Sequence, residues 1–306
     1  MSRNPILDAQ IFSSLRTNKG HKEIAKIFDC SIHTVRRLSA IKPVRVLLIA
    51  DLHCGSNVGL TPPAYQYKII QHPDTEEHAK RNKWAQLQIE CWEWYVRTLN
   101  LINPVDKCFV LGDLIDGTGL RSGGTELITT DRKVQTCMAI EALESIQTGG
   151  MIFVYGTPYH TGQTEDWETD ISHHFGCKIG AHEWEDVNGV IFDLKHKQSN
   201  TKNPATSLFN EIVDNREWAL SEEQPKANVL VRAHTHRFCS LQLEDCLAIS
   251  LPALQSFGSK FGARQCTRRV HFGFIVLDVW PDGFIQPHVF IAKLHGHKAQ
   301  SNQELK

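Results

Sequence analysis

The sequence predicts an α/β domain with mixed sheets, preceded by a small all-α domain. From residue 44 onward, short runs of β-branched and other apolar residues alternate with longer stretches of helical periodicity. Residues 1–42 are instead typical of three short helices, and this segment ends at Ile41-Lys42-Pro43. The chain has 306 residues, of which 41% are apolar, so it can form a large core. We therefore expect a small domain over 1–42 and a large domain over 43–306.

Apolar residues of the N-terminal segment recur at helical spacing. The positions expected to be buried are Ile6, Ile11, Phe12 and Leu15 in a first helix, Ile24, Ala25 and Phe28 in a second, and Val35 and Leu38 in a third. Between the last two helices, Asp29 occupies the turn position where glycine often adopts the left-handed conformation. Ser31 can then cap the third helix. Two helices joined by a three-residue turn resemble a helix-turn-helix.

The N-terminal segment is also basic. Residues 1–42 carry eight Lys and Arg against three Asp and Glu, a net charge of +5, whereas the whole chain has a net charge of −1. This asymmetry favours a DNA partner for the segment, bound through its third helix. The residues expected to enter a groove are Ile32, His33, Thr34, Arg36 and Arg37. The alternative is a helical domain that docks onto protein or forms oligomers.

Buried strands and intervening helices predict the larger domain. The expected strands are Val44–Ala50, Lys107–Leu111, Met151–Tyr155, Val190–Leu194, Asn228–Arg232 and Leu247–Leu251. The expected helices are His78–Leu99 and Asp131–Ser145, and a closing hairpin is expected at His271–Trp280 and Phe284–Lys293. This order is typical of an α/β domain with mixed sheets.

Composition also bears on the compartment. The longest apolar runs, near 44–50 and 274–280, are too short to cross a bilayer. The first residues lead into no apolar stretch of the kind found in secretory signals. Nine cysteines without a Cys-x-x-Cys pair do not resemble a disulfide framework. We therefore expect no membrane partner and a reducing cytoplasm.

Asp or His residues follow five of the predicted strands. The segments are Asp51-Leu52-His53, Gly112-Asp113-Leu114-Ile115-Asp116-Gly117, Gly156-Thr157-Pro158-Tyr159-His160, Lys195-His196-Lys197 and Ala233-His234-Thr235-His236. Because side chains alternate along a strand, the His-x-His pair is expected to present both imidazoles to one face. Each segment alone has a plain alternative as a turn or a packing feature. Together, at strand ends where α/β folds collect their ligands, they predict a metal or catalytic site.

Residues 44 to 240 resemble the calcineurin-like metallophosphoesterases. The ordered motifs of that family are Asp-x-His, Gly-Asp-x-x-Asp, Gly-Asn-His-Asp/Glu, a lone His and Gly-His-x-His. A phage and prophage branch with a Gly-Thr-x-x-His third motif is particularly similar. The resemblance implies a four-layer α/β/β/α sandwich and a dinuclear metal site. The implied ligands are Asp51, His53 and His236 for one ion, His196 and His234 for the second, and Asp113 as the bridge between them.

The resemblance also implies hydrolysis of phosphate esters by a hydroxide that bridges two metal ions. Mixed Asp/His ligands suit Mn²⁺, Fe, Zn²⁺ or Ni²⁺, and Mn²⁺ is the ion we expect. Nucleic-acid phosphodiesters are the preferred substrate because of the N-terminal segment, and a phage-encoded protein would act in the host cytoplasm. The alternatives are a phosphomonoesterase acting on phosphoprotein or nucleotide, and a DNA-binding regulator with a degenerate hydrolase body. The physiological substrate and the oligomeric state stay open.

The third motif departs from the family pattern. Thr157 stands where the family has a ligating Asn, and the histidine comes three residues later. His160 is therefore expected either to protonate the leaving oxygen and orient the phosphate, or to replace the Asn as a ligand. Asp116 is expected to orient its neighbours rather than bind metal. Arg121, in the loop 118–130, could clamp a phosphate, although a plain solvated loop is the alternative, and Cys54 is expected to pack beside the site.

Overall fold

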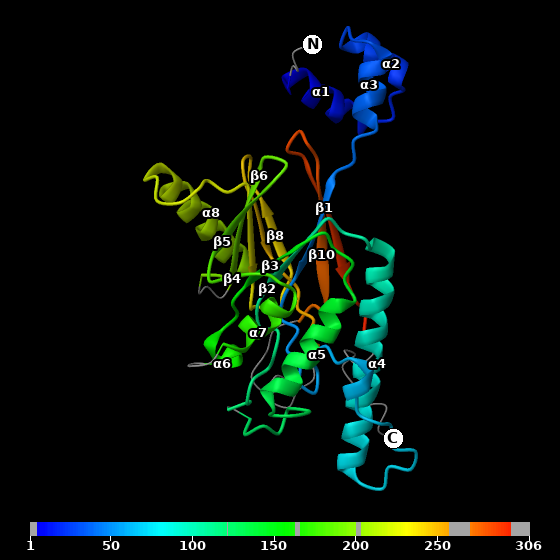
Figure 1. Ribbon diagram of the computed structural model, residues 1–306, viewed down its shortest axis with the longest axis vertical. Helices are drawn as coiled ribbons and strands as arrows, with labels where there is room; N and C mark the ends of the chain where they lie inside the picture. Colours follow the sequence, from blue (N-terminus) through cyan, green and yellow to red (C-terminus); the bar gives the residue numbers. More distant parts are fainter. Residues whose placement is uncertain (1–4, 121, 163–165, 200–202, 257–269, 295–306) are drawn as a thin grey trace.

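Two β-sheets form the centre of the larger domain (Figure 1). The computed structural model describes residues 5–120, 122–162, 166–199, 203–256 and 270–294. The first sheet has the order β11-β10-β1-β2-β3-β4 and the second has the order β5-β6-β7-β9-β8. Both sheets contain parallel and antiparallel neighbours. The prediction of mixed sheets is therefore confirmed.

Five of the eight predicted strands, β1, β2, β3, β7 and β9, begin and end within one residue of the predicted positions. The strands of the first sheet are β1 (Val44–Ile49), β2 (Lys107–Leu111), β3 (Met151–Val154), β4 (Ile179–Gly180), β10 (Gly273–Val279) and β11 (Ile285–Ile291). Those of the second sheet are β5 (Glu183–Val187), β6 (Val190–Lys197), β7 (Val229–Ala233), β8 (Cys239–Gln242) and β9 (Leu247–Ser250). The expected end of β6 is wrong, because this strand continues to Lys197 and so contains His196.

Helices cover the outer face of each sheet. The helices of the larger domain are α4 (Glu76–Ile102), α5 (Arg132–Glu144), α6 (Pro158–Thr161), α7 (Trp167–His174) and α8 (Pro204–Leu220), with a short 3₁₀ helix η1 at Pro63–Tyr65. Helices α4, α5 and α7 lie on the first sheet, and α8 lies on the second (Figure 1). Among the described helices, none combines the length and the apolar character needed to cross a bilayer.

Alternation along β1 shows how the layers are held together. Val46 and Leu48 belong to the core between the two sheets, whereas Leu47 and Ile49 belong to the core beneath α4, α5 and α7. On the far side, Leu208 of α8 packs against the second sheet. A strand buried on both faces in this way requires a continuous apolar run, which is what the sequence of β1 provides. The layer order α/β/β/α is therefore confirmed.

The parallel strands bring their C-terminal ends to one edge. β1, β2 and β3 are parallel neighbours in the first sheet, and β6 and β7 are parallel neighbours in the second. The turns after β1 and β2 are hydrogen-bonded to each other, since the N–H of Asp51 donates to Gly112 O at 2.9 Å and that of His53 donates to Asp113 O at 3.0 Å. We call the turns after β1, β2, β3 and β7, together with the end of β6, the carboxyl rim.

Three N-terminal helices form a separate small core. They are α1 (Pro5–Leu15), α2 (His21–Ile27) and α3 (Ile32–Ser39). Its buried residues are Ile11, Phe12, Ile24, Val35 and Leu38. The prediction for Ile6 is wrong, because its side chain is 72% exposed and Leu7 packs against this core instead. Asp29 has the expected left-handed backbone, with a φ of 45°, and the Ser31 side chain accepts a hydrogen bond from Thr34 N as an N-cap.

Helix α1 rests on the turn of the β10–β11 hairpin. Arg16 pairs with Asp282, with 2.8 Å between Nη2 and Oδ2, and its guanidinium lies 4.0 Å from the ring centroid of Phe284. The rings of Phe12 and Trp280 lie 6.5 Å apart. Because this contact combines an ion pair with aromatic packing, it attaches the N-terminal helices to the larger domain beyond the chain connection itself.

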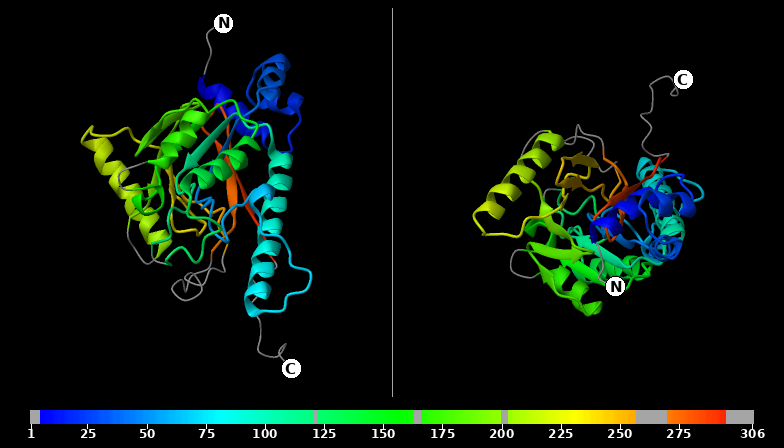
Figure 2. Two further views of the ribbon diagram at one scale, coloured as in Figure 1. Left: turned by 60° about the horizontal axis from the view of Figure 1, so that its bottom comes forward. Right: turned by 90° about the horizontal axis from the view of Figure 1, so that it is seen from above.

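The N-terminal helices and the carboxyl rim lie at opposite ends of β1 (Figures 1 and 2). The strand starts at Val44, which is paired with Val279 just before the hairpin turn. It ends at Ile49, two residues before Asp51. Six residues of extended strand span about 20 Å. Helix α3 is therefore separated from the rim by the full length of the sheet.

Candidate metal centre

The six predicted ligands gather at the carboxyl rim in two groups of three. The first group is Asp51, His53 and His236, and the second is Asp113, His196 and His234. Within each group, the potential ligand atoms all lie within 4.8 Å of one another. The sequence motifs therefore meet in space as well as in order.

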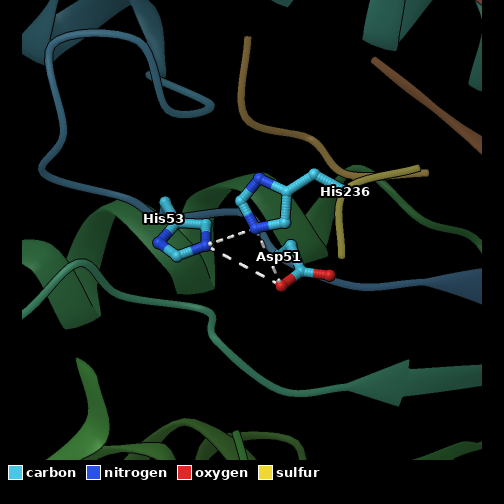
Figure 3. A group of neighbouring side chains, drawn as sticks. All are labelled: Asp51, His53 and His236. Atoms are coloured by element: carbon cyan, nitrogen blue, oxygen red, sulfur yellow. Dashed lines mark hydrogen bonds and ion pairs between the residues drawn. The ribbon is translucent and has the colours of Figure 1, made fainter. Parts of the chain in front are cut away.

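In the first group, three donor atoms converge from the turns after β1 and β7 (Figure 3). Asp51 Oδ1 lies 3.2 Å from His236 Nε2 and 3.8 Å from His53 Nε2. The two imidazole nitrogens lie 3.2 Å apart. Cations bound at about 2.1 Å in tetrahedral or octahedral geometry hold neighbouring donors about 3.0–3.4 Å apart. Two of the three distances lie in this range, and the third, between Asp51 and His53, is 0.4 Å longer than its upper limit. The group can therefore hold one divalent cation after a small movement of Asp51 or His53.

The second group combines β6 with the turns after β2 and β7. His196 Nε2 lies 3.1 Å from Asp113 Oδ2, and His234 Nδ1 lies 3.8 Å from the same oxygen. The side chains of Asp113 and His196 are almost completely buried, whereas that of His234 is 40% exposed. This group therefore opens to solvent on the side of His234.

Asp51 connects the two groups. Its Oδ1 also lies 4.0 Å from His196 Nε2, and its Oδ2 accepts a hydrogen bond from His234 N at 3.1 Å. Asp113, which the sequence resemblance implies as the bridge, belongs to the second group and is not among the donors of the first. Its bridging role stays a prediction.

Two atoms at the junction of the groups bear on whether the residues fit a cation. Asp51 Oδ1 and His196 Nε2 are buried, and neither has a hydrogen-bond partner in the described part of the chain. A buried carboxylate oxygen without a partner costs several kcal/mol unless a cation lies beside it. The donor set of carboxylates and imidazoles is also one that divalent transition metals prefer. The residues of both groups therefore fit metal ions.

The acids and the imidazoles of the rim shift one another's pKa values. Burial would raise the pKa of Asp51, but the charge of His236 and the close contacts with His236 and His53 hold that pKa well below its usual value. Burial would lower the pKa of His53, but Asp116 and Asp51 raise it to about 10. Burial would likewise lower the pKa of His196, but the charge and hydrogen bond of Asp113 raise it to about 9. The protons held in this way are those that a cation would displace.

Second partners orient two of the histidines. His53 Nδ1 lies 2.8 Å from Asp116 Oδ1, and His196 Nδ1 lies 2.5 Å from Leu111 O. Because these oxygens accept, each Nδ1 is the donor, and each Nε2 remains available to a cation. This arrangement is common in metal-binding histidines, where the partner fixes the tautomer and the ring. Asp116 contacts His53 in this way, but it is also one of a third set of candidate donors with His53 and His160, so its orienting role stays a prediction.

His160 lies beside the first group and, with His53 and Asp116, forms a third set of donors whose ligand atoms lie within 4.8 Å of one another. It is placed by α6, its ring is 4.5 Å from that of His53, and its Nδ1 lies 3.0 Å from the backbone oxygen of Asp116. Because a carbonyl only accepts, His160 Nδ1 donates and Nε2 is the nitrogen available to a substrate. Both predicted roles, work on the substrate and ligation, therefore remain open to test.

Backbone conformation at the rim is unusual. Five of the six residues have positive φ, and only His196 is extended. The values are 54° for Asp51, 47° for His53, 51° for Asp113, 70° for His234 and 54° for His236. The expectation that strand alternation presents His234 and His236 to one face is therefore wrong. These residues follow β7 in a left-handed turn, and each joins a different group.

Sequence reasoning gave no role to Glu168 or to the hydroxyl of Thr157. Glu168 is fully buried on α7 and accepts hydrogen bonds from Leu114 N at 2.8 Å and Gly156 N at 2.7 Å. Thr157 donates to Asp113 Oδ1 through its N–H at 2.6 Å and its hydroxyl at 3.1 Å. Motif spacing does not reveal Glu168, because both its partners are backbone groups distant in sequence.

Other predicted residues lie away from the two groups or outside the described residues. Cys54 is buried in the core, and burial raises the pKa of its thiol well above the usual value, consistent with a packing role. Arg121 lies outside the described residues. On α3, His33, Arg36 and Arg37 are exposed, Thr34 is half-buried and its hydroxyl contacts Ser31, and Ile32 is half-buried.

Comparison with known proteins gives similarity in structure only. The chain matches no protein-family model and no curated protein sequence. Among solved structures, zinc-bound Vps29 from Entamoeba histolytica has 11% identity and a TM-score of 0.42, covering 81% of this chain and 98% of that one. An archaeal phosphodiesterase has 13% identity and a TM-score of 0.39, covering 80% and 99%. A predicted phosphoesterase from Streptococcus pneumoniae has 11% identity and a TM-score of 0.32, covering 83% and 100%. At these scores, the assignment of the site rests on its own residues.

Proposed function

We propose that this protein hydrolyses phosphate esters with two divalent cations held at the carboxyl rim, and that nucleic-acid phosphodiesters are its substrate class. The observation that carries the proposal is the pairing of two buried three-donor groups, linked through Asp51. A single group would be compatible with a structural metal. Two adjacent groups at the exposed end of a sheet are the arrangement that phosphoryl chemistry uses.

Each residue of the rim has a separate task in this proposal. The first group holds one cation and the second group holds the other, and Asp116 fixes the tautomer of His53. Bound there, the two cations would lower the pKa of a water and offset the negative charge of the phosphoryl oxygens. His160, which lies outside the two groups that hold the cations in this proposal, uses its Nε2 to deliver a proton to the leaving oxygen or to orient the phosphate. Exposed His234 marks the side from which substrate enters.

Charge on the N-terminal helices supports nucleic acid as the substrate class. Helix α3 exposes Arg36 and Arg37, and α2 exposes Lys22 and Lys26. Arg37 has only a long contact of 3.9 Å with Asp8, so its charge is not neutralised by a close pair. Basic side chains presented on short helices bind the phosphates of DNA. The surface complements a polyanion that carries many phosphodiester bonds.

The experiment that tests the proposal compares bis-aryl and mono-aryl phosphate as substrates of metal-stripped protein resupplied with Mn²⁺. Preference for the diester is the expected result and leads to DNA substrates. Preference for the monoester would contradict the substrate class and favour a phosphatase acting on phosphoprotein or nucleotide. Absence of turnover with Mn²⁺, Fe, Zn²⁺ and Ni²⁺ would leave a DNA-binding regulator with an inactive body.

Two variants test the metal assignment. Asp113→Asn and Asp51→Asn each remove one carboxylate charge at the junction of the groups, and both should abolish turnover and lower the Mn²⁺ bound per chain. If one carboxylate joins the two ions, its variant should lose both Mn²⁺ ions. The variant of the other carboxylate should lose one Mn²⁺ ion. Elemental analysis after gel filtration measures the ratio. Undiminished turnover in Asp113→Asn would disprove its role as a bridge.

A further inference from the structure

Glu168 is a buried carboxylate beside the rim that neither group includes. It comes from the first turns of α7 and has no exposed surface. Its two oxygens accept from two different turns, Oε1 from Leu114 N at 2.8 Å and Oε2 from Gly156 N at 2.7 Å. Burial and the charge of Asp113 raise the pKa of Glu168 to about 8, so its two oxygens, rather than a fixed charge, are what the turns share. One side chain thus connects the turn after β2 to the turn after β3.

Those two turns carry Asp113 and Thr157, which are hydrogen-bonded to each other. Leu114 follows Asp113, and Gly156 precedes Thr157, which donates to Asp113 Oδ1 through both its N–H and its hydroxyl. The approach at Gly156 is so close that a Cβ there would collide with the backbone nitrogen and the carboxylate of Asp113. Small relative movement of the turns would therefore displace the Asp113 oxygens from His196 and His234.

We propose that Glu168 is a positioning residue that locks the turns after β2 and β3 together and so places the Asp113 carboxylate for cation binding. This inference rests on the proposed function, because it concerns the second group of the same site. The shape and the acceptor atoms of the side chain matter: its two oxygens offer an acceptor to each N–H, whereas an amide of the same size offers one acceptor and one donor. With Gln, one of the two buried N–H groups would face an N–H₂ and lose its partner.

The test is Glu168→Gln in the full chain, compared with Glu211→Gln. Glu211 is a suitable control because it also accepts a backbone N–H, from Ser199 at 2.7 Å, but on the outer face of the second sheet. Mn²⁺ affinity is measured by calorimetric titration of metal-stripped protein. Changes to groups that hold a ligand in place weaken metal binding by about 10–100-fold. We expect a loss of this size in Glu168→Gln and none in Glu211→Gln.

Hydrogen exchange and kinetics separate positioning from a general loss of stability. Peptides covering 112–117 and 154–160 should lose amide protection in Glu168→Gln, while peptides from β7 and β9 keep theirs. At saturating Mn²⁺, kcat for an aryl phosphodiester should fall and KM should stay near the wild-type value. A shorter acid, Glu168→Asp, keeps two oxygen acceptors and should restore part of the Mn²⁺ affinity that Glu168→Gln loses.

Two outcomes would overturn the inference. Unchanged Mn²⁺ affinity and unchanged protection of 112–117 in Glu168→Gln would show that the turns hold together without it. Equal loss of affinity in the Glu168 and Glu211 variants would show a general effect of stability. Because affinity and exchange are measured without substrate, these outcomes are distinct from failure of the proposed function, which is seen as inactive wild-type protein.

Discussion

His160 differs from the other histidines of the carboxyl rim in what its nitrogens can do. Its Nδ1 donates to the backbone oxygen of Asp116, and it lies outside the two groups that contain the six predicted ligands. Its ring packs edge-on against that of His53, so it stays close to the first group. A histidine held in this way can act on the leaving oxygen or on a phosphoryl oxygen without contributing to metal affinity.

Substitution of His160 by Gln should therefore lower kcat for an aryl phosphodiester by about 10²-fold or more, with Mn²⁺ content unchanged. The matched control is His173→Gln, which changes an exposed histidine on α7 and should leave both quantities at wild-type values. Steady-state kinetics and elemental analysis of the same samples measure the two effects. Loss of one Mn²⁺ in His160→Gln would instead show that His160 is a ligand.

Some residues of the carboxyl rim could be identified from their type and order in the sequence, whereas others are identified only by their contacts in the structure. The grouping of Asp51, His53 and the other candidate ligands at one edge could be predicted because carboxylate and imidazole in that order have few other uses. Glu168 could not, because its role depends on two backbone N–H groups, one of them 54 positions away. For His234 and His236 the chemistry was predicted and the backbone was not, since no sequence pattern shows that a non-glycine residue is left-handed.

Between elements, the largest buried charge cluster of the second sheet joins β6, β7 and α8. Arg232 on β7 is 3% exposed and pairs with Asp193 at 2.6 Å and with Glu211 at 2.9 Å. His182 contacts the same Asp193 oxygen at 2.8 Å. This cluster lies on the face of the sheet opposite to the core that the two sheets share, so it holds α8 in place and takes no part in the metal centre.

Removal of one acid that pairs with Arg232 should lower the free energy of unfolding strongly. Asp193→Ala leaves the Arg232 guanidinium buried with one acid instead of two, and about 3–5 kcal/mol of the free energy of unfolding should be lost. The control is Asp245→Ala, which removes the partner of Arg216 and Lys226 on the surface and should cost about 0–1 kcal/mol. Urea unfolding followed by circular dichroism measures both. A similar loss in free energy of unfolding in the two variants would contradict a stabilising role for the buried cluster around Arg232.

The same cluster predicts a pH dependence of stability. Burial would raise the pKa of Asp193, but the hydrogen bond with His182 and the charge of Arg232 lower it below its usual value. A group with a lowered pKa stabilises the fold fully above the ordinary aspartate value of about 4, and its contribution is lost as the pH falls through the lowered pKa. The urea midpoint of the wild type should therefore fall more steeply below pH 4 than that of Asp193→Ala.

Elements were predictable where burial leaves a simple pattern. The strands β1, β2 and β3 are apolar on both faces, and their runs stand out in the sequence. β5 was not predicted because three of its five residues are acidic, which suits an edge strand with one face in solvent. Helix α8 was missed because its apolar residues form only a narrow stripe against the sheet.

At the scale of the whole molecule, the DNA-binding surface proposed for α3 and the carboxyl rim would contact different stretches of a bound duplex. They are separated by the length of β1, about 20 Å, and the contact of Arg16 with Asp282 holds the N-terminal helices at the far end. This separation could not be predicted from the sequence, because it depends on where the hairpin turn meets α1. One chain would therefore bind a duplex at α3 and cleave at a different position.

The arrangement predicts which kinetic constant the basic surface controls. In Arg36→Ala/Arg37→Ala, KM for long DNA should rise and its salt dependence should weaken by about two units of slope, whereas kcat and the hydrolysis of an aryl phosphodiester should not change. A duplex rises 3.4 Å per base pair, so about six base pairs span β1. Oligonucleotides too short to reach both sites should show no difference between variant and wild type. Equal losses on short and long substrates would contradict the role of α3.

The left-handed backbone of the rim has a consequence for how such a chain can change over generations. A non-glycine residue in this region costs about 1–2 kcal/mol relative to the ordinary conformations, and Asp51, His53, Asp113, His234 and His236 all adopt it. Glycine would relieve that cost at each position. Selection for heat tolerance alone would thus favour replacing these side chains, and a lineage freed from its reaction would gain stability by losing its site first.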